Sequence, residues 1–155
     1  MKKALIIAIA LLAGCFTAWG DDPTFRVGAG MLSGRDAHPT PGVTLGIDIN
    51  TPMPAGIGIF SDFYLSPDDG GMKPTTFVGM NTLYKSTSIE ENRKGRVYFG
   101  GGGGLMNSSV SRLFVNGVVG GNVKVTQGVN VFVQTKFYYV PKGRWNTGLH
   151  VGVSF

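Results

Sequence analysis

The sequence has almost no cysteine and few charged residues. Cys15 is the single cysteine among 155 residues, so neither an intrachain disulfide nor a cysteine-rich metal site can form. Charged residues make up 15% of the chain. No apolar run approaches the roughly 20 residues that a membrane-spanning helix needs. Helical periodicity of apolar residues is also missing from residue 21 onward, so we predict one all-β domain.

The surplus of positive charge is small and scattered. The formal net charge is +5, and the one local cluster of cations is Arg93, Lys94 and Arg96. Nucleic-acid-binding domains concentrate their cations on one face, so we predict no nucleic-acid partner. The run from Gly100 to Gly104 lacks the Lys-Ser or Lys-Thr pair and the following helix of a phosphate-binding loop, so we predict no nucleotide site. We expect no catalytic, cofactor-binding or metal-binding residues.

The first 20 residues are predicted to be a secretory signal peptide. Two lysines precede ten uninterrupted apolar residues, Ala4 to Ala13, and small residues follow. Two cleavage sites stay open. One follows Gly20. The other precedes Cys15, where Leu12 to Cys15 resembles the lipobox of bacterial lipoproteins and would make Cys15 the acylated residue. We therefore expect an exported protein whose mature domain covers residues 21–155.

Eight segments of the mature chain alternate between apolar and polar residues with a period of two, as strands do. They are Phe25–Leu32, Val43–Asn50, Gly56–Leu65, Thr75–Lys85, Arg96–Met106, Arg112–Val125, Val129–Tyr139 and Trp145–Phe155. Sequences rich in glycine, proline and aspartate separate them and favour turns. The connections expected at one end are Ser33–Pro41, Ser66–Pro74, Asn107–Ser111 and Pro141–Arg144.

The two faces of these segments differ sharply. One face is apolar throughout, as at Leu45, Val131 and Val151, whereas the other carries glycines, amides and a few charges of both signs. Apolar-out and polar-in alternation over about ten residues is typical of membrane-spanning β-strands, which must close into a barrel to pair every backbone group. We predict an eight-stranded antiparallel up-and-down transmembrane β-barrel. Its predicted interior charge network is Arg26, Asp48, Asp62, Arg96, Arg112, Lys124 and Lys136.

Aromatic residues near the strand ends predict girdles at the membrane interfaces. They are Phe25, Tyr64, Tyr84, Tyr98, Tyr138, Tyr139, Trp145 and Phe155. In the middle of the fifth segment, five consecutive glycines remove side chains from both faces, and we predict that they make room for bulky interior residues of neighbouring strands.

Three stretches resemble the small eight-stranded outer-membrane barrels of Gram-negative bacteria, the opacity-protein-like family. They are Tyr98 to Leu105, Val118 to Gly128 and Leu149 to Phe155. The alternating Leu149, Val151, Val153 and Phe155 resemble the family's C-terminal signal for the barrel-assembly machinery. The resemblance implies a location in the cell outer membrane, with outer-membrane lipid and that machinery as partners. We expect a monomer with a structural or envelope-stabilising role and a side-chain-filled interior that is not a porin.

Two alternatives remain open from the residues. Some small outer-membrane barrels modify lipid A with a His and Ser pair on the lipid-facing surface, but His150 and Ser154 are predicted to face inward. A soluble exported barrel that binds an apolar ligand, as lipocalins do, would need its apolar face inward.

Overall fold

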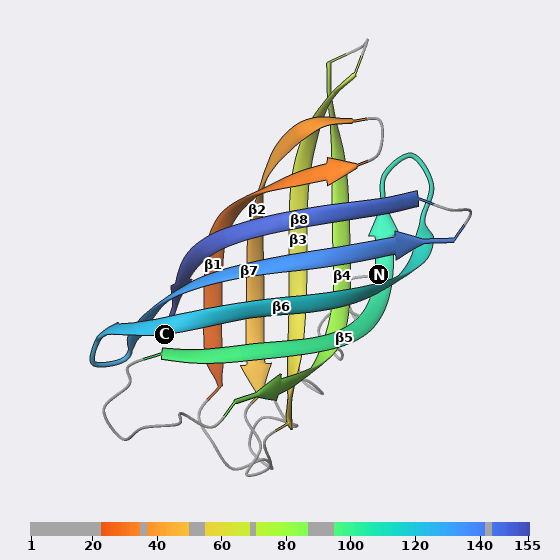
Figure 1. Ribbon diagram of the computed structural model, residues 1–155. Helices are drawn as coiled ribbons and strands as arrows, with labels where there is room; N and C mark the ends of the chain where they lie inside the picture. Colours follow the sequence, from red (N-terminus) through yellow and green to blue (C-terminus); the bar gives the residue numbers. More distant parts are fainter. Residues whose placement is uncertain (1–22, 35–36, 50–54, 69–70, 87–94, 142–143) are drawn as a thin grey trace, which may run out of the picture.

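The chain forms a closed barrel of eight strands. The computed structural model describes residues 23–34, 37–49, 55–68, 71–86, 95–141 and 144–155. The strands are β1 (Thr24–Gly34), β2 (Ala37–Ile49), β3 (Ala55–Asp68), β4 (Gly71–Lys85), β5 (Gly95–Asn107), β6 (Arg112–Thr126), β7 (Val129–Val140) and β8 (Arg144–Ser154). Each strand pairs antiparallel with its sequence neighbours, and β8 returns to β1 (Figure 1). The predicted up-and-down barrel is confirmed.

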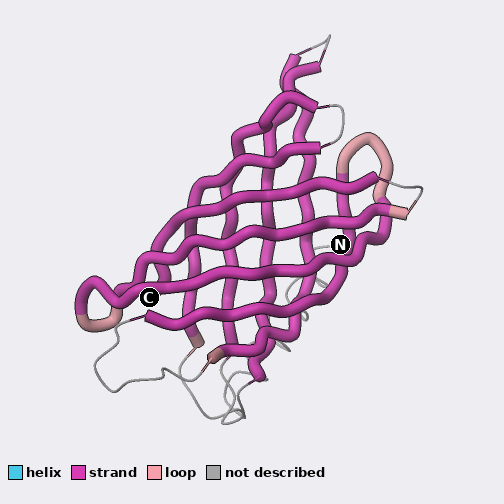
Figure 2. Tube along the Cα trace, viewed as in Figure 1, coloured by secondary structure: helices cyan, strands magenta, loops and turns pink. Residues whose placement is uncertain are grey.

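Strand accounts for almost all of the described chain (Figure 2). Within the described ranges, no helix has the length and apolar character needed to cross a bilayer. The predicted signal peptide, residues 1–20, and the candidate lipidation site Cys15 lie outside the described residues.

The strands extend further than predicted at the end of the barrel where β1 leads into β2. β2 begins at Ala37, so the predicted connection Ser33–Pro41 is wrong: Pro39 and Pro41 lie inside a strand. Ladder pairing of β2 with β3 starts only at Gly42. The preceding part of β2 therefore has an open edge, where the missing N–H of a proline interrupts no ladder.

The same extension shortens the connection between β3 and β4. The predicted connection Ser66–Pro74 is wrong, because these strands pair as far as Asp68 and Gly71. The hairpin consequently projects beyond the rest of the wall at the top of Figure 1.

The register of the strands sets their tilt. Starting at Thr24, partners across successive strands are Asp48, Gly58, Asn81, Gly102, Asn116, Tyr138, Asn146 and finally Gly34. The path returns to β1 ten residues from its start. Such a stagger makes the strands tilt by roughly 35–45° from the barrel axis. In Figure 1, β1 to β4 consequently cross β5 to β8 at a steep angle, as two layers of one closed sheet.

Glycines occupy the two seams where these layers meet, β4–β5 and β8–β1. A Cβ on Gly102 would lie 1.8 Å from the carbonyl oxygen of Met80, and one on Gly152 would lie 2.2 Å from that of Val27. Only a residue without a side chain permits this approach. The five glycines of β5 therefore let the wall bend sharply, but the atoms nearest to a Cβ at these positions belong to the backbone and to Asn81, not to aromatic rings. Gly79 of β4 leaves the room for interior rings instead, because a Cβ there would lie 3.0 Å from the rings of both Phe60 and Phe114.

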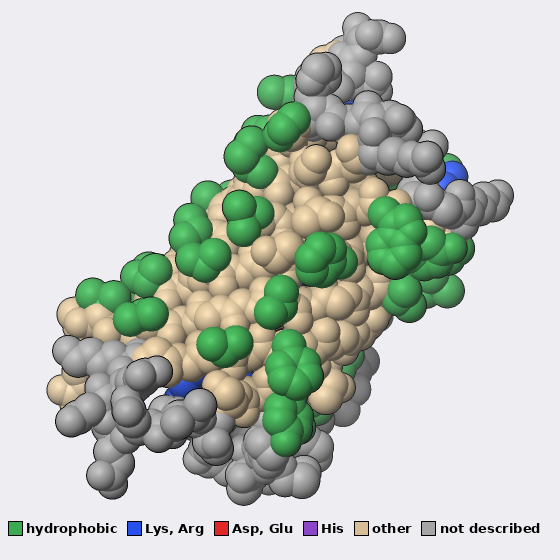
Figure 3. Space-filling view, viewed as in Figure 1, with side chains coloured by type: hydrophobic (Ala, Val, Ile, Leu, Met, Phe, Trp, Pro, Cys, Tyr) green, Lys and Arg blue, Asp and Glu red, His purple; other side chains and the backbone are tan. Residues whose placement is uncertain are grey.

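The apolar face of the wall points outward. Leu45, Val131 and Val151 are 53%, 40% and 51% exposed, and most large hydrophobic side chains on the outward positions are similarly exposed. In Figure 3, groups of hydrophobic side chains are spread over the whole visible wall, while Lys and Arg emerge only near its two ends. This orientation is the reverse of what a soluble apolar-ligand barrel requires.

The predicted aromatic girdle is right in part. Phe25 and Phe155 are exposed and stack with ring centroids 6.2 Å apart. Exposed Trp145 lies 4.8 Å from the ring of Tyr139, and Tyr84 also faces outward. The prediction was wrong for Tyr64, Tyr98 and Tyr138, which are buried inside the barrel because their register positions face inward.

Candidate functional site

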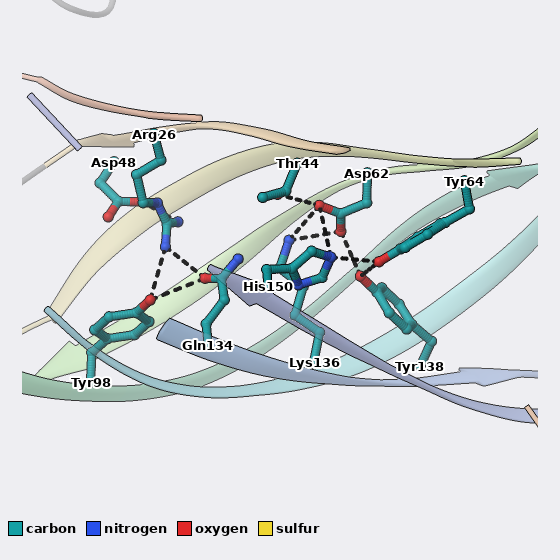
Figure 4. A network of polar contacts seen from close by, with 10 residues as sticks. All are labelled: Arg26, Thr44, Asp48, Asp62, Tyr64, Tyr98, Gln134, Lys136, Tyr138 and His150. Atoms are coloured by element: carbon teal, nitrogen blue, oxygen red, sulfur yellow. Dashed lines mark hydrogen bonds and ion pairs between the residues drawn. The ribbon is translucent and has the colours of Figure 1, made fainter. Parts of the chain in front are cut away.

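The inward positions of the barrel hold two polar clusters. The first, called here the Asp62 cluster, contains Thr44, Asp62, Tyr64, Lys136, Tyr138 and His150 (Figure 4). The second, called the Arg26 cluster, contains Arg26, Asp48, Tyr98 and Gln134 (Figure 4). Members of each cluster come from strands on opposite sides of the barrel, so each cluster spans the lumen.

Asp62 accepts four hydrogen bonds. Lys136 Nζ donates to its Oδ1 at 2.9 Å and its Oδ2 at 2.7 Å. The hydroxyl of Tyr138 donates to Oδ2 at 2.5 Å, and Thr44 Oγ1 donates to Oδ1 at 2.5 Å. The side chains of Asp62 and Lys136 are fully buried, so this ion pair is isolated from water and its charges are matched within the protein.

His150 joins the cluster through Tyr64. Its Nε2 lies 2.5 Å from the Tyr64 hydroxyl and 4.0 Å from Asp62 Oδ1. The Tyr64 hydroxyl also lies 3.5 Å from that of Tyr138. The Lys136 ammonium sits 3.8 Å from the centroid of the Phe60 ring, a cation–π contact. The cluster is thus a network of hydrogen bonds closed on one side by aromatic rings.

An aromatic plug covers the Asp62 cluster toward the mouth where β1 leads into β2. The plug consists of Leu32, Phe60, Tyr64, Phe77, Phe114, Tyr138 and Val140, with Met106 packed against it. Phe77 stacks on Tyr138 at 4.3 Å and meets Phe114 edge-on at 5.3 Å. These rings fill the lumen on that side of the ion pair.

The Arg26 cluster lies deeper along β1 and β2, toward the other mouth. Arg26 Nη2 donates to Asp48 Oδ1 at 2.6 Å, and Nη1 donates to Gln134 Oε1 at 2.9 Å. The Tyr98 hydroxyl donates to the same amide oxygen at 3.1 Å. Lys85 is 4.0 Å from Asp48 and is itself only half-buried. Asp48 is therefore shared by two cations near the barrel end.

Four of the seven residues in the predicted charge network form two ion pairs, and the other three lie near the mouths of the barrel. Arg26 pairs with Asp48, and Lys136 pairs with Asp62. Arg96 and Lys124 are exposed, at inward register positions where β5 begins and β6 ends. Arg112 is half-buried at the opposite mouth. Alternation predicted which way these side chains face but not their depth along the barrel.

Thr44 was not singled out from the sequence, and the three tyrosines of the clusters were assigned to the girdle instead of the interior. Tyr64 and Tyr138 follow Asp62 and Lys136 by two residues and so face the same way. Thr44, Gln134 and Tyr98 occupy inward positions by the same rule. These residues could have been found by listing the inward-facing positions that lie at the same height in the barrel as each charged residue.

The interior does not assemble a hydrolytic site from the residues considered earlier. His150 and Ser154 are both buried in the lumen rather than on the outer wall. The closest contact of His150 is with a tyrosine hydroxyl. In the part of the chain that the structure describes, no group of three or more His, Cys, Asp or Glu side chains gathers to hold a metal ion.

Polar atoms remain unpaired beside Gly102. Asn81 on β4 and Asn116 on β6 are its register partners on the two sides. Both amides are buried, and the Asn81 oxygen and both polar atoms of the Asn116 amide lack a protein partner. This is the least complete part of the interior hydrogen bonding.

Comparison with known proteins shows the fold. No family model and no curated protein matches the chain. The solved structure of Neisserial surface protein A is similar with a TM-score of 0.70 at 11% identity, covering 85% of this chain and 95% of that one. The N-terminal barrel domain of OprF from Pseudomonas aeruginosa has a TM-score of 0.52 at 15% identity over 85% of this chain and 97% of that one.

A third similar structure is Ail, the attachment invasion locus protein of Yersinia pestis, in complex with the heparin analogue sucrose octasulfate. Its TM-score is 0.56 at 11% identity, covering 86% of this chain and 97% of that one. The chain therefore has the fold of small eight-stranded outer-membrane barrels.

Proposed function

We propose that the protein is an outer-membrane β-barrel with a structural, envelope-stabilising role and an interior that conducts no solutes of porin size. The observation that carries the proposal is the combination of an apolar outer wall with lumen-filling polar and aromatic clusters. An apolar exterior of this extent is stable only in lipid, and an eight-stranded barrel has a lumen that side chains can fill. The likeness to outer-membrane barrels supports the location.

Two matched variants test the membrane orientation. Val131 faces outward and its neighbour Asn130 faces inward on β7, at nearly the same depth. Val131→Arg should destabilise the barrel by about 2 kcal/mol in a lipid refolding titration, because it puts a charge into hydrocarbon. Asn130→Arg should cost clearly less. Equal costs, or a greater cost at Asn130, would contradict the orientation.

Conduction is tested in planar bilayers. The aromatic plug and the two ion pairs fill the lumen in series, so reconstituted protein should give no stable channel of porin conductance. The incomplete hydrogen bonding beside Gly102 is the weakest part of this seal. Large reproducible channels in the parent protein would refute the sealed interior.

Export and assembly are part of the same proposal. Mass analysis of the mature N-terminus separates cleavage after Gly20 from lipidation at Cys15. Phe155 is exposed and stacks on Phe25, and its backbone pairs with that of Phe25 in both directions, at 2.8 and 3.0 Å. If the Leu149-Val151-Val153-Phe155 pattern is the assembly signal, Phe155→Ser should lower the yield of heat-modifiable protein in the outer membrane while refolding in detergent proceeds.

A further inference from the structure

One mouth of the barrel holds an open basin above the aromatic plug. Two adjoining pockets, of about 260 and 150 Å³, share Ser66, Thr75, Met106 and Ser108 in their linings. Every strand contributes at least one residue to the basin, so its shape depends on the whole closed barrel. It lies at the mouth where β1 leads into β2, next to the plug residues Leu32, Phe77 and Val140.

The walls and floor of the basin differ in chemistry. The walls carry the hydroxyls of Ser66, Thr75 and Ser108 and the amide of Asn146. The floor includes Met106 and Phe77, which belong to or pack against the plug. Hydroxyl and amide groups around an apolar floor match a sugar ring, which has hydroxyls at its edge and C–H groups on its faces.

Arg112 gives the basin its charge. It lines the wall beside Met106, its register partner on β5, and both residues are half-buried on inward positions. Among the side chains that the structure describes, no carboxylate is paired with Arg112, and none lines either pocket. Lys73 adds a second cation to the lining. A guanidinium can recognise a carboxylate or a phosphate with two parallel hydrogen bonds.

We propose that the basin binds a single anionic sugar residue. The anionic group lies on the Arg112 guanidinium, the sugar hydroxyls meet the serine and threonine side chains, and one ring face rests on Met106. The larger pocket is near the lower limit of small-molecule sites, which suits one ring better than a chain of rings. This ligand site goes beyond the structural role proposed above and does not depend on which membrane holds the barrel.

Methionine methyl NMR of the full chain refolded in micelles tests the site. The chain has six methionines, and loss of one signal in Met106→Leu identifies the methyl group on the basin floor. Titration with D-glucuronate should shift the Met106 signal saturably, whereas D-glucose and sodium acetate, tested at the same concentrations, should shift it much less.

Two variants complete the experiment. Arg112→Gln should weaken glucuronate binding by about tenfold or more, because a hydrogen bond to a charged group is lost. Lys124→Gln, which removes a cation at the opposite mouth, should leave the affinity unchanged. The proposal is overturned if Met106 does not respond saturably to glucuronate, or if glucose or acetate shifts it as strongly. It is also overturned if heat-modifiable Arg112→Gln protein binds glucuronate as tightly as the parent.

Discussion

Asp62 and Asp48 are buried carboxylates on inward positions of neighbouring strands, yet their surroundings differ. Asp62 has no exposed surface and is enclosed by hydrogen-bond donors and the aromatic plug. Asp48 accepts a hydrogen bond from Arg26 at 2.6 Å and has the half-buried Lys85 at 4.0 Å near a barrel mouth. A charge beside the mouth can be compensated by a second cation or by water, whereas a charge behind the plug depends wholly on its fixed partners.

The largest effect is expected at Lys136. Lys136→Met keeps a long side chain beside Phe60 but removes the cation that pairs with Asp62. The variant should lose about 3–5 kcal/mol of stability, as broken buried ion pairs do. Urea-induced unfolding in lipid vesicles, followed by tryptophan fluorescence, measures this loss. If Lys136→Met lost less unfolding free energy than Arg26→Met, the Asp62 cluster would not be the one that depends more on its cation.

Arg26→Met should have a smaller effect, of about 2 kcal/mol. Lys85 remains 4.0 Å from Asp48 and is itself partly exposed near the mouth. We therefore expect the cost to change with salt concentration, because accessible charges are screened more than enclosed ones. The unfolding titration is repeated at low and high salt, with Lys136→Met as the reference whose cost should stay nearly constant.

Alanine at two glycines compares the packing around the clusters. A Cβ on Gly79 would meet the Gly103 carbonyl oxygen at 2.7 Å and two plug rings at 3.0 Å, so Gly79→Ala should cost about 1–3 kcal/mol through overpacking. A Cβ on Gly46 would lie 3.3 Å from the Ile59 carbonyl oxygen and 3.5 Å from Arg26 Nε. Gly46→Ala should therefore be milder. If the two variants unfold at the same urea concentration, the plug is not the more tightly packed region.

The smallest effect is expected from Tyr64→Phe. The change keeps the ring in the plug and removes the hydroxyl that contacts His150. Loss of one buried hydrogen bond should cost about 1 kcal/mol. In NMR spectra, the His150 ring signals should move more than the Met106 methyl signal, because the hydroxyl points toward the cluster rather than the basin.

The sequence was sufficient to predict the fold because alternation in a membrane barrel has a single physical cause. Leu45, Val131 and Val151 must face lipid, and the residues between them must face the lumen. The clusters were less predictable. Tyr64, Tyr98 and Tyr138 stand near strand ends, where an aromatic residue suits either an interface or a lumen, and only their register separates the two.

The ends of the strands could not be predicted from local sequence patterns either. Pro39 and Pro41 suggested a loop, but a strand with one open edge tolerates them. Arg96 and Lys124 could be assigned to the inward face by alternation, but their exposure follows from the stagger of the strands. The stagger depends on pairing between distant segments, which no local pattern records.

The pairing of β8 with β1 has a kinetic consequence. Val27 meets Val153 and Gly34 meets Asn146, so the first and last strands of the barrel are hydrogen-bonded to each other. Strands that are neighbours in the sequence can pair starting from the turn that joins them. The β8–β1 ladder must instead bring together segments more than 100 residues apart, and such long-range pairing is slow. Until it forms, two strand edges are exposed to any other chain with a free edge. Closure of this ladder is thus the step at which folding competes with aggregation, and synthesis of the last residues must precede it.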